Sequence, residues 1–327
     1  MSPPTASVVQ AARPRILDRR ARLQAAAGSI SAEYLDDLLA EVDAALQRID
    51  NGTYGICEYC HDTIEADRLE VDPLARFCVD HLGEKELRAH EQDIELASRI
   101  QSRLLPSNDL PVEGWETHYE YQPAGPVGGD YCEAATECGQ SLFFAVGDIS
   151  GKGVAASLLM THLSAILRSL MPLQLPLAEL VARANRLFCE STLAAHYATL
   201  VCGRAGRDEV ELCNAGHCPP FHLRRDGAQR LDGAGLPLGL FSNVQYPVTH
   251  VRLAAGESLV LYSDGVTEAL DPEGNEFGEE RLAHSLRTCY GTSAEQLARS
   301  VLADAISFRA GCRAADDVTL MVVRRRP

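Results

Sequence analysis

The stretch Val146-Gly147-Asp148-Ile149-Ser150-Gly151-Lys152-Gly153 decides the fold of most of this chain. An apolar run, residues 141–146, comes before it and predicts a buried strand. Apolar side chains at helical spacing follow it over residues 154–170. The glycines let the short side chain of Asp148 point into a shared cleft without steric conflict. The stretch therefore predicts a strand, an aspartate-bearing turn and a helix.

Three further aspartate sites have similar short settings at the ends of predicted strands. They are Gly128-Gly129-Asp130-Tyr131, Tyr262-Ser263-Asp264-Gly265 and Ala315-Asp316-Asp317-Val318-Thr319. Each one alone is more typical of a turn than of a ligand. Together they gather carboxylates, which are costly to place side by side unless a cation neutralises them, and Mn²⁺ and Mg²⁺ prefer oxygen ligands. Two such ions about 3.5–4 Å apart would clamp a phosphate and activate a bridging water.

The pattern of elements from Gly114 onward predicts an α+β layered sandwich, because strands follow one another like hairpins and helices are grouped between them. The expected strands are Thr117–Tyr121, Ser141–Val146, Ala198–Gly203, Glu209–Cys213, Ser258–Tyr262 and Val318–Val323. The expected helices are Val154–Leu170, Leu177–Leu193, Glu279–Cys289 and Ala294–Ser307. Strict βαβ alternation and internal repeats are not seen.

Seven short motifs share one order with a known family. They are Ile100-Gln101 with Leu104-Leu105-Pro106, Gly128-Gly129-Asp130-Tyr131, Gly147-Asp148-Ile149-Ser150-Gly151-Lys152-Gly153, Asn214-Ala215-Gly216-His217, Gly235-Leu236-Pro237-Leu238-Gly239, Ser263-Asp264-Gly265-Val266-Thr267-Glu268 and Asp316-Asp317-Val318-Thr319. Over about residues 92–325 the chain resembles the SpoIIE/RsbU branch of the protein phosphatase 2C-like, metal-dependent phosphatases. The resemblance implies two antiparallel sheets flanked by helices, an α-β-β-α sandwich, and hydrolysis of phosphoserine or phosphothreonine without a covalent intermediate.

The resemblance also implies a role for each matching residue. Asp148 would be the catalytic ligand that bridges both Mn²⁺ or Mg²⁺ ions, and the carbonyl of Ile149 would bind one of them. Asp264 and Asp316 would complete the shell of the other ion, and Asp130 would bind directly or through a metal-bound water. A register error of one residue would exchange Asp316 for Asp317.

The group that binds the substrate phosphate is not assigned by the resemblance. Eukaryotic relatives use an arginine for which this chain has no counterpart in a matching motif. Lys152 and His217 are the candidates, and each also fits a structural role.

A second phosphatase pattern, His-Cys-x5-Arg, occurs from His217 to Arg224 and would make Cys218 a nucleophile. That chemistry needs backbone N–H groups that cradle phosphate and lower the pKa of the thiol. Pro219 and Pro220 each remove one such donor, and no glycine lies between Cys218 and Arg224. We therefore do not expect a cysteine mechanism.

A zinc site is predicted upstream by ligand spacing. Cys57-Glu58-Tyr59-Cys60 is followed seventeen residues later by Cys78-Val79-Asp80-His81. Three thiolates and one imidazole make a closed tetrahedral set, which is typical of one structural Zn²⁺. The ligands would be Cys57, Cys60, Cys78 and His81.

The residues around these ligands resemble the DksA/TraR zinc-finger family over about residues 14–90. The matching pieces are Asn51 to Cys60, Arg68-Leu69-Glu70, Pro73 and Ala75-Arg76-Phe77-Cys78. The family usually has a fourth cysteine at the position of His81. Its members act on RNA polymerase through a coiled-coil tip, but the acidic tip motif has no match here. A regulatory or dimerising module is the other reading.

Charge, cysteines and apolar runs limit the function classes. The net charge of −16 argues against general nucleic-acid binding and against direct DNA contact. The eleven cysteines are odd in number and scattered, unlike a secreted disulfide framework. The longest apolar runs are far below the roughly 20 residues of a membrane span, and we expect no signal peptide at the start of the chain. A cytoplasmic protein without a membrane segment is expected.

The expected organisation has four parts. They are a disordered N-terminus at 1–13, a helical hairpin plus zinc finger at 14–83, a linker or switch helix at 84–106 and the phosphatase domain at 107–327. The expected substrate is a phosphoprotein such as an anti-sigma-factor antagonist. The helix at 84–106 could relay a signal, form a homodimer, or be a plain amphipathic linker. The alternative function is a non-catalytic transcription regulator that binds RNA polymerase through the zinc module.

Overall fold

The computed structural model describes residues 6–25, 32–81, 84–107, 110, 112–137, 141–192, 196–207 and 209–327. The chain divides into two compact units, Met1–Asp93 and Ile94–Pro327. The division falls inside the expected linker helix, and each unit is described by itself below.

Two five-stranded antiparallel sheets form the framework of the second unit. The first sheet has the order β1 (Trp115–Gln122), β10 (Val318–Arg325), β9 (Ser258–Tyr262), β6 (Phe221–Arg224) and β7 (Gly227–Arg230). The second has the order β2 (Tyr131–Glu137), β3 (Ser141–Ile149), β4 (Ala198–Ala205), β5 (Val210–Ala215) and β8 (Val248–Val251).

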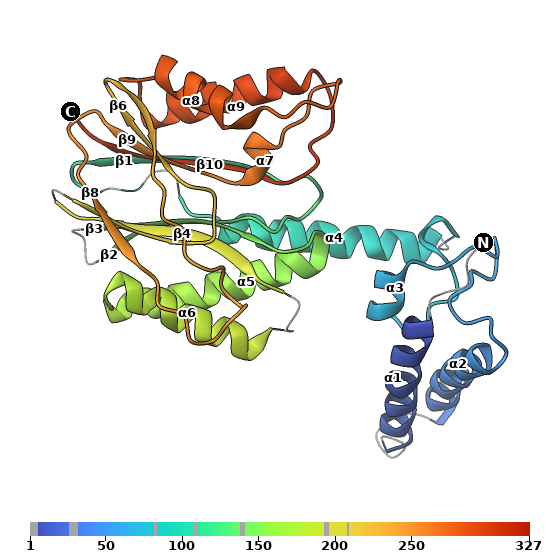
Figure 1. Cartoon of the computed structure of the whole chain (residues 1–327). Helices are drawn as coiled ribbons and strands as arrows, with labels where there is room; N and C mark the ends of the chain where they lie inside the picture. The colour runs from blue at the N-terminus through green and yellow to red at the C-terminus, as the bar shows by residue number, and fades with distance from the viewer. Residues whose placement is uncertain are drawn as a thin grey trace. The chain divides into compact units, whose positions relative to one another are not determined.

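Helices cover the outer face of each sheet (Figure 1). The first sheet packs against α8 (Gly278–Thr288) and α9 (Ala294–Arg309), and the second against α5 (Gly153–Leu170) and α6 (Leu177–Ser191). Two short elements, η2 (Met171–Leu173) and α7 (Asp264–Thr267), follow α5 and β9. The predicted α-β-β-α sandwich is confirmed.

The position of strand β3 between two layers explains why its central residues are all apolar. Leu142, Phe144 and Val146 face the core between the two sheets, whereas Phe143 and Ala145 face α5 and α6. Side chains alternate between the faces of a strand, so a strand covered on both faces needs apolar residues at every position. The same rule explains the apolar β10.

The strand directions bring the predicted aspartates to the ends of the sheets. Asp148 lies one residue before the end of β3, and Asp130 precedes the paired start of β2. In the other sheet Asp264 lies two residues after the end of β9, and Asp316 lies two residues before the antiparallel start of β10. Each sheet therefore presents two of the four aspartates.

The strands β2, β6, β7 and β8 were not in the sequence prediction, although every predicted strand and helix is present. β2 contains Ala134, Ala135 and two glutamates, which are residues of low strand propensity. Its pairing with β3 along the full length of the strand overrides that local preference. Local composition alone therefore missed this strand.

The first unit contains α1 (Ala6–Ala25), α2 (Ala32–Asp50), α3 (Ala66–Val71) and the short η1 (Val79–His81). Arg13 bonds Asp50 and Arg20 bonds Asp43, which places α1 and α2 in the expected antiparallel hairpin. The expectation of disorder over residues 1–13 is wrong from Ala6 onward, because α1 begins there and includes Pro14. Its residue Ala12 and the neighbouring Ile16 are buried in the core of this unit, which holds the start of the helix in place. Residues 1–5 lie outside the described part.

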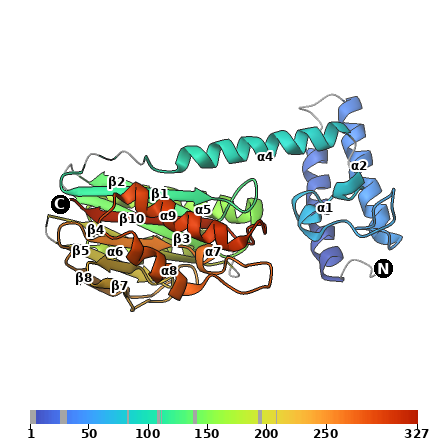
Figure 2. The same ribbon diagram turned by 90° about the horizontal axis from the view of Figure 1, so that it is seen from above.

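The expected linker is one helix, α4 (Glu84–Leu104) (Figure 2). A different segment, Gly153–Leu173, is long and apolar enough to cross a membrane, with a mean hydropathy of 1.4. Leu163 and Leu167 of that segment are fully buried against the second sheet and α6. This packing accounts for the apolar composition of α5, which belongs to the core of the sandwich.

Candidate active site

Asp148 is the centre of the carboxylate group. It lies opposite Thr199 in the register of β3 and β4. Burial, followed by the negative charges of Asp264, Asp316 and Asp317, raises the pKa of Asp148 to about 7. Since like charges act over short distances, carboxylates from both sheets are gathered around Asp148.

The backbone at Gly129 lies against the turn that follows Asp148. A Cβ atom at Gly129 would be 3.2 Å from the carbonyl oxygen of Ile149 and 3.5 Å from Asp148 Oδ1. These two oxygens therefore lie near the same point, as expected for the backbone and side-chain ligands of one ion. A side chain at position 129 would crowd both oxygens and the Cβ atom of Ala156, which also lies 3.2 Å from that point.

Asp264 begins α7 and is half-buried. Burial raises the pKa of Asp264, and the charge of Asp316 adds to the effect. The next residue, Gly265, lies so close to the carbonyl group of Asp317 that any Cβ would overlap it. This close approach of two backbones places Asp264 beside Asp316.

The neighbours Asp316 and Asp317 have different environments. Asp316 Oδ2 lies 2.8 Å from the Nζ atom of Lys152, and its side chain is 36% exposed. Asp317 is buried, and its carboxylate accepts backbone N–H groups from Ala124 at 2.7 Å and from Gly129 at 2.6 Å. The carboxylate of Asp317 therefore holds the loop before β2, whereas that of Asp316 faces the site. This supports Asp316 as the ligand, which stays a prediction.

Asp130 is the most deeply buried member of the group, with 2% exposure. Its Oδ2 atom accepts hydrogen bonds from Ser263 Oγ at 2.7 Å and Thr319 Oγ1 at 2.5 Å. Burial raises the pKa of Asp130 well above its usual value, and the charge of Asp148 acts in the same direction. The hydroxyl groups occupy Oδ2 and leave Oδ1 as the oxygen that a metal-bound water would use. Since the donors come from the first sheet, Asp130 also links the sheets.

The aspartates do not converge on a single point. Within the described residues, one group of Cys, His, Asp and Glu side chains is close enough to hold one ion, and it is the cysteine–histidine group upstream. A site for two ions distributes its ligands around both of them. The donor set is acidic, oxygen-rich and partly buried, which fits hard divalent ions.

Gln101 of α4 is a site residue whose role the sequence did not reveal. Its side chain is 5% exposed, its Nε2 atom donates to the Gly128 carbonyl at 2.6 Å, and its Oε1 atom accepts the Gly128 N–H at 3.0 Å. The end of the same helix is held by Arg168 of α5, which donates to the Leu104 carbonyl and to buried Glu133. The end of α4 therefore contacts the backbone next to Gly129. The available signal was the motif Ile100-Gln101, to which the resemblance assigned no contact.

Of the two candidates for phosphate binding, only Lys152 is accessible. Its side chain is 66% exposed and its Nζ atom also donates to the Ala315 carbonyl. His217 is 4% exposed, and its Nδ1 atom lies 2.8 Å from Thr199 Oγ1. A ring buried in this way does not reach a substrate phosphate.

The environment of Cys218 opposes a cysteine mechanism. Burial, followed by the charges of Asp264, Glu279 and Glu268, raises the pKa of this thiol to about 12. A nucleophilic cysteine needs the opposite, a lowered pKa in positive surroundings. Cys218 is therefore a protonated thiol near neutral pH.

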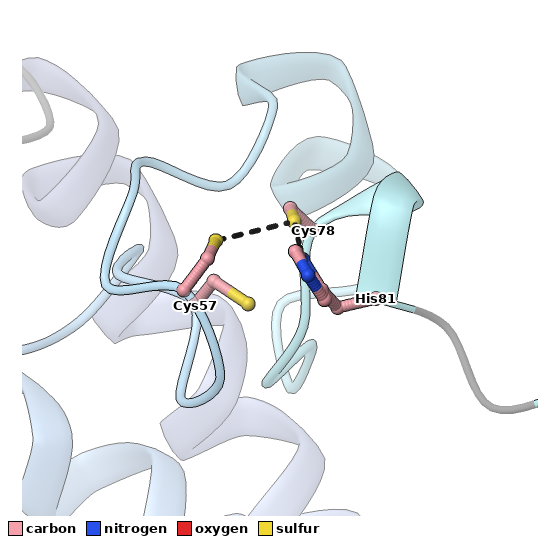
Figure 3. Close-up of side chains that lie close together, drawn as sticks. Cys57, Cys78 and His81 are labelled. Carbon is pink, nitrogen blue, oxygen red and sulfur yellow. Dashed lines mark hydrogen bonds between the residues drawn. The ribbon is translucent and has the colours of Figure 1, made fainter.

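The predicted zinc ligands form a compact group in the first unit (Figure 3). The ligand atoms of Cys57, Cys60, Cys78 and His81 all lie within 4.8 Å of one another. Cys78 Sγ is 3.7 Å from Cys60 Sγ and 3.1 Å from His81 Nδ1. The ring of Tyr59 stacks on that of His81 at 4.5 Å. These distances suit four ligands around one tetrahedral ion, with Nδ1 as the imidazole donor.

The thiols of this group have opposite tendencies to ionise. Burial tends to raise the pKa of Cys57, but backbone hydrogen bonds from Cys60, Cys78 and Tyr59 lower it to about 6. Burial, together with the neighbouring thiols Cys57 and Cys60, raises the pKa of Cys78 to about 11. Adjacent thiolates repel one another, so a cation is needed to ionise all three. The donor set therefore fits Zn²⁺.

Two family profiles match the chain. Residues 139–326 match the family described as Stage II sporulation protein E (SpoIIE). Residues 52–80 match the prokaryotic dksA/traR C4-type zinc finger, and His81 lies just beyond the matched range. The two matches correspond to the two candidate metal sites.

Individual relatives are similar over most of the chain. Protein IcfG of Synechocystis is 26% identical over 263 residues, which are 71% of this chain and 41% of that protein. The phosphoserine phosphatase RsbU of Bacillus subtilis is 27% identical over 241 residues, which are 72% of this chain and 71% of RsbU. The chain thus spans less than half the length of IcfG. The SiaA-PP2C domain of Pseudomonas aeruginosa has the same fold, with a TM-score of 0.64 and 22% identity over 73% of this chain and 98% of that domain.

Proposed function

This chain belongs to the SpoIIE family, and from that premise we propose that it is a metal-dependent protein serine/threonine phosphatase. The observation that carries the proposal is the gathering of Asp264 and Asp316 from one sheet around Asp148 and the Ile149 carbonyl from the other. Solved phosphatases with this fold contain manganese or magnesium ions. The chemistry of the donor set favours the same ions here.

We propose the following roles for the residues of the site. Asp148 would serve both ions, the carbonyl of Ile149 would bind one of them, Asp264 and Asp316 would complete the shell of the other, and Asp130 would bind directly or through a metal-bound water. When bound, the pair of ions would acidify a bridging water and neutralise the phosphate. Lys152, next to Asp316, is placed to contact the substrate phosphate. Gly129 keeps the entrance in front of Asp148 free of side chains.

The proposed substrate is a phosphorylated signalling protein, with an anti-sigma-factor antagonist as the specific candidate. RsbU is by name a phosphoserine phosphatase, and it matches this chain over most of both lengths. An acidic site repels a negatively charged phosphate. Binding is favoured when the substrate protein has positive residues near its phosphate or when the metal ions neutralise the site. We propose a cytoplasmic location for this reaction.

We propose that the upstream module binds one structural Zn²⁺ through Cys57, Cys60, Cys78 and His81 and regulates the phosphatase. The end of α4 supports a relay, because Gln101 bonds both backbone groups of Gly128 next to Gly129. A displacement of α4 would move that loop and alter the space in front of Asp148. Pairing of two α4 helices in a homodimer would be one way to produce such a displacement.

The test is phosphate release from a phosphoserine protein or peptide by the full chain, with Mn²⁺ added or chelated. We expect turnover that requires Mn²⁺ or Mg²⁺ and does not require a free thiol. Absence of turnover on every phosphoprotein tried, together with binding to RNA polymerase, would instead support the transcription-regulator function.

A further inference from the structure

The turn after β5 fixes the position of one buried histidine. The Asn214 side chain accepts the N–H of His217 at 2.8 Å and donates to its carbonyl at 3.0 Å, which closes a ring of hydrogen bonds. Gly216 has a φ of +75°, and a Cβ there would lie 2.6 Å from Pro237. Only glycine combines that backbone conformation with that contact. The turn therefore leaves His217 little freedom.

The ring of His217 lies next to β4, the strand that pairs with β3 at Asp148. Its Nδ1 atom is 2.8 Å from Thr199 Oγ1, and that oxygen is 3.3 Å from the carbonyl oxygen of Asp148. Its Nε2 atom is buried and has no hydrogen-bond partner among the described residues. Burial lowers the pKa of His217 to about 4, whereas the backbone of Tyr262 favours protonation of the ring. The imidazole thus contacts β4 at the position opposite Asp148.

Thr199 lies opposite Asp148 in the second sheet. We propose that His217 is a positioning residue that holds Thr199 and, through it, the backbone of Asp148, and so determines the affinity for the metal ions. This inference rests on the proposed function and assigns a role to the Asn-Ala-Gly-His stretch. His217 acts through Thr199 and the backbone, without touching substrate.

The matched comparison is with His222, a second buried histidine. His222 lies on β6, and its Nε2 atom is 2.9 Å from Glu257. Glu257 does not lie at the strand ends that carry the aspartates, so this contact is outside the site. We expect His217→Gln to weaken Mn²⁺ binding by about tenfold, the scale reported for residues that orient metal ligands. The KM for a phosphopeptide should stay within about twofold at saturating Mn²⁺, because His217 does not contact substrate. His222→Gln should leave Mn²⁺ affinity unchanged.

The measurements are isothermal titration with Mn²⁺, phosphopeptide kinetics and thermal denaturation, all on the full zinc-loaded chain. Equal Mn²⁺ affinity in the two variants would overturn the inference, whatever their melting temperatures. Wild-type protein that neither binds Mn²⁺ nor releases phosphate would overturn the proposed function and the inference together. An active wild type with a normal His217→Gln variant would overturn the inference alone.

A second pair of variants covers the case in which His217→Gln does not fold. Thr199→Val removes the hydroxyl group and keeps the shape, and we expect it to weaken Mn²⁺ binding in the same direction. Its control is Thr117→Val on β1, since Thr117 Oγ1 is buried and has no hydrogen-bond partner among the described residues. Wild-type Mn²⁺ affinity in Thr199→Val would overturn the inference. Where both single variants fold, additive losses in the double variant would also overturn it, because one relay predicts non-additivity.

Discussion

The zinc-ligand group and the aspartate group both collect side chains that repel one another when ionised, but the chain assembles them differently. Cys57, Cys60, Cys78 and His81 come from two short knuckles of one small unit and lie within 4.8 Å of one another. The aspartates come from four separate segments of two sheets and are held by partners far away in sequence, such as Ser263 and Thr319 on Asp130.

This difference indicates which of the two sites needs its metal ion in order to fold. A small unit whose core includes two ligand cysteines needs the ion to hold that core together. The sandwich has three large apolar cores and holds its carboxylates by packing and hydrogen bonds. We expect metal removal to unfold the zinc module and to leave the sandwich folded but inactive.

The largest effect should follow loss of the zinc. Cys60→Ser should abolish stoichiometric zinc binding and expose residues 52–81 to proteolysis, because about 10 kcal/mol or more of binding free energy stabilises such modules. The melting temperature of the sandwich should not change. Zinc content by mass spectrometry and limited proteolysis check this, with the exposed Cys312→Ser as the control. A module that stays protected without zinc would remove the contrast between the two sites.

Asp148→Asn should have the next largest effect. We expect phosphate release to fall by about 10³-fold, which corresponds to about 4 kcal/mol of transition-state stabilisation. The carboxylate is central to the site, so Mn²⁺ binding should weaken while zinc content stays at one ion per chain. Exposed Glu273→Gln is the control variant. More than a tenth of wild-type activity in Asp148→Asn would contradict the dinuclear site.

Asp316→Asn and Asp317→Asn should separate the ligand from its neighbour. Asp317→Asn should lower the free energy of unfolding by about 2 kcal/mol, because its buried carboxylate accepts backbone N–H groups that an amide N–H₂ cannot satisfy. Asp316→Asn should cost less than about 1 kcal/mol, since its pair with Lys152 is largely exposed. It should nevertheless raise the Mn²⁺ concentration needed for activity. Denaturant unfolding and Mn²⁺ titration measure both, and the reverse pattern would assign the ligand to Asp317.

The smallest effect is expected at Cys218. Burial and nearby carboxylates raise the pKa of its thiol to about 12, so it is protonated and carries no nucleophilic role. We expect Cys218→Ser to keep phosphate release within about twofold of the wild type. Loss of turnover with an unchanged melting temperature would restore the cysteine mechanism.

The sequence predicted the layers of the sandwich and the two ligand groups because these depend on local patterns. Strand β3 has apolar residues at successive positions, which indicates burial on both faces. The spacing of the zinc ligands likewise indicates a common metal site. The supporting contacts are not local. That Asp317 holds the loop at Gly129, and that Gln101 holds Gly128, depends on segments brought together only by the fold. The edge strands, such as β7, were missed because pairing with a neighbour outweighs their weak propensity.

The position of β10 has a consequence for the order in which the two metal sites form during synthesis. This last strand lies between β1 and β9, and Asp316 immediately precedes it. All four zinc ligands leave the ribosome long before it. We expect a nascent chain stalled before Asp316 to bind zinc already. Its first sheet would lack β10 between β1 and β9, and it would have no affinity for Mn²⁺. Catalytic competence would then appear only after Asp316 and β10 have been synthesised, so a chain that lacks them would not dephosphorylate its substrate.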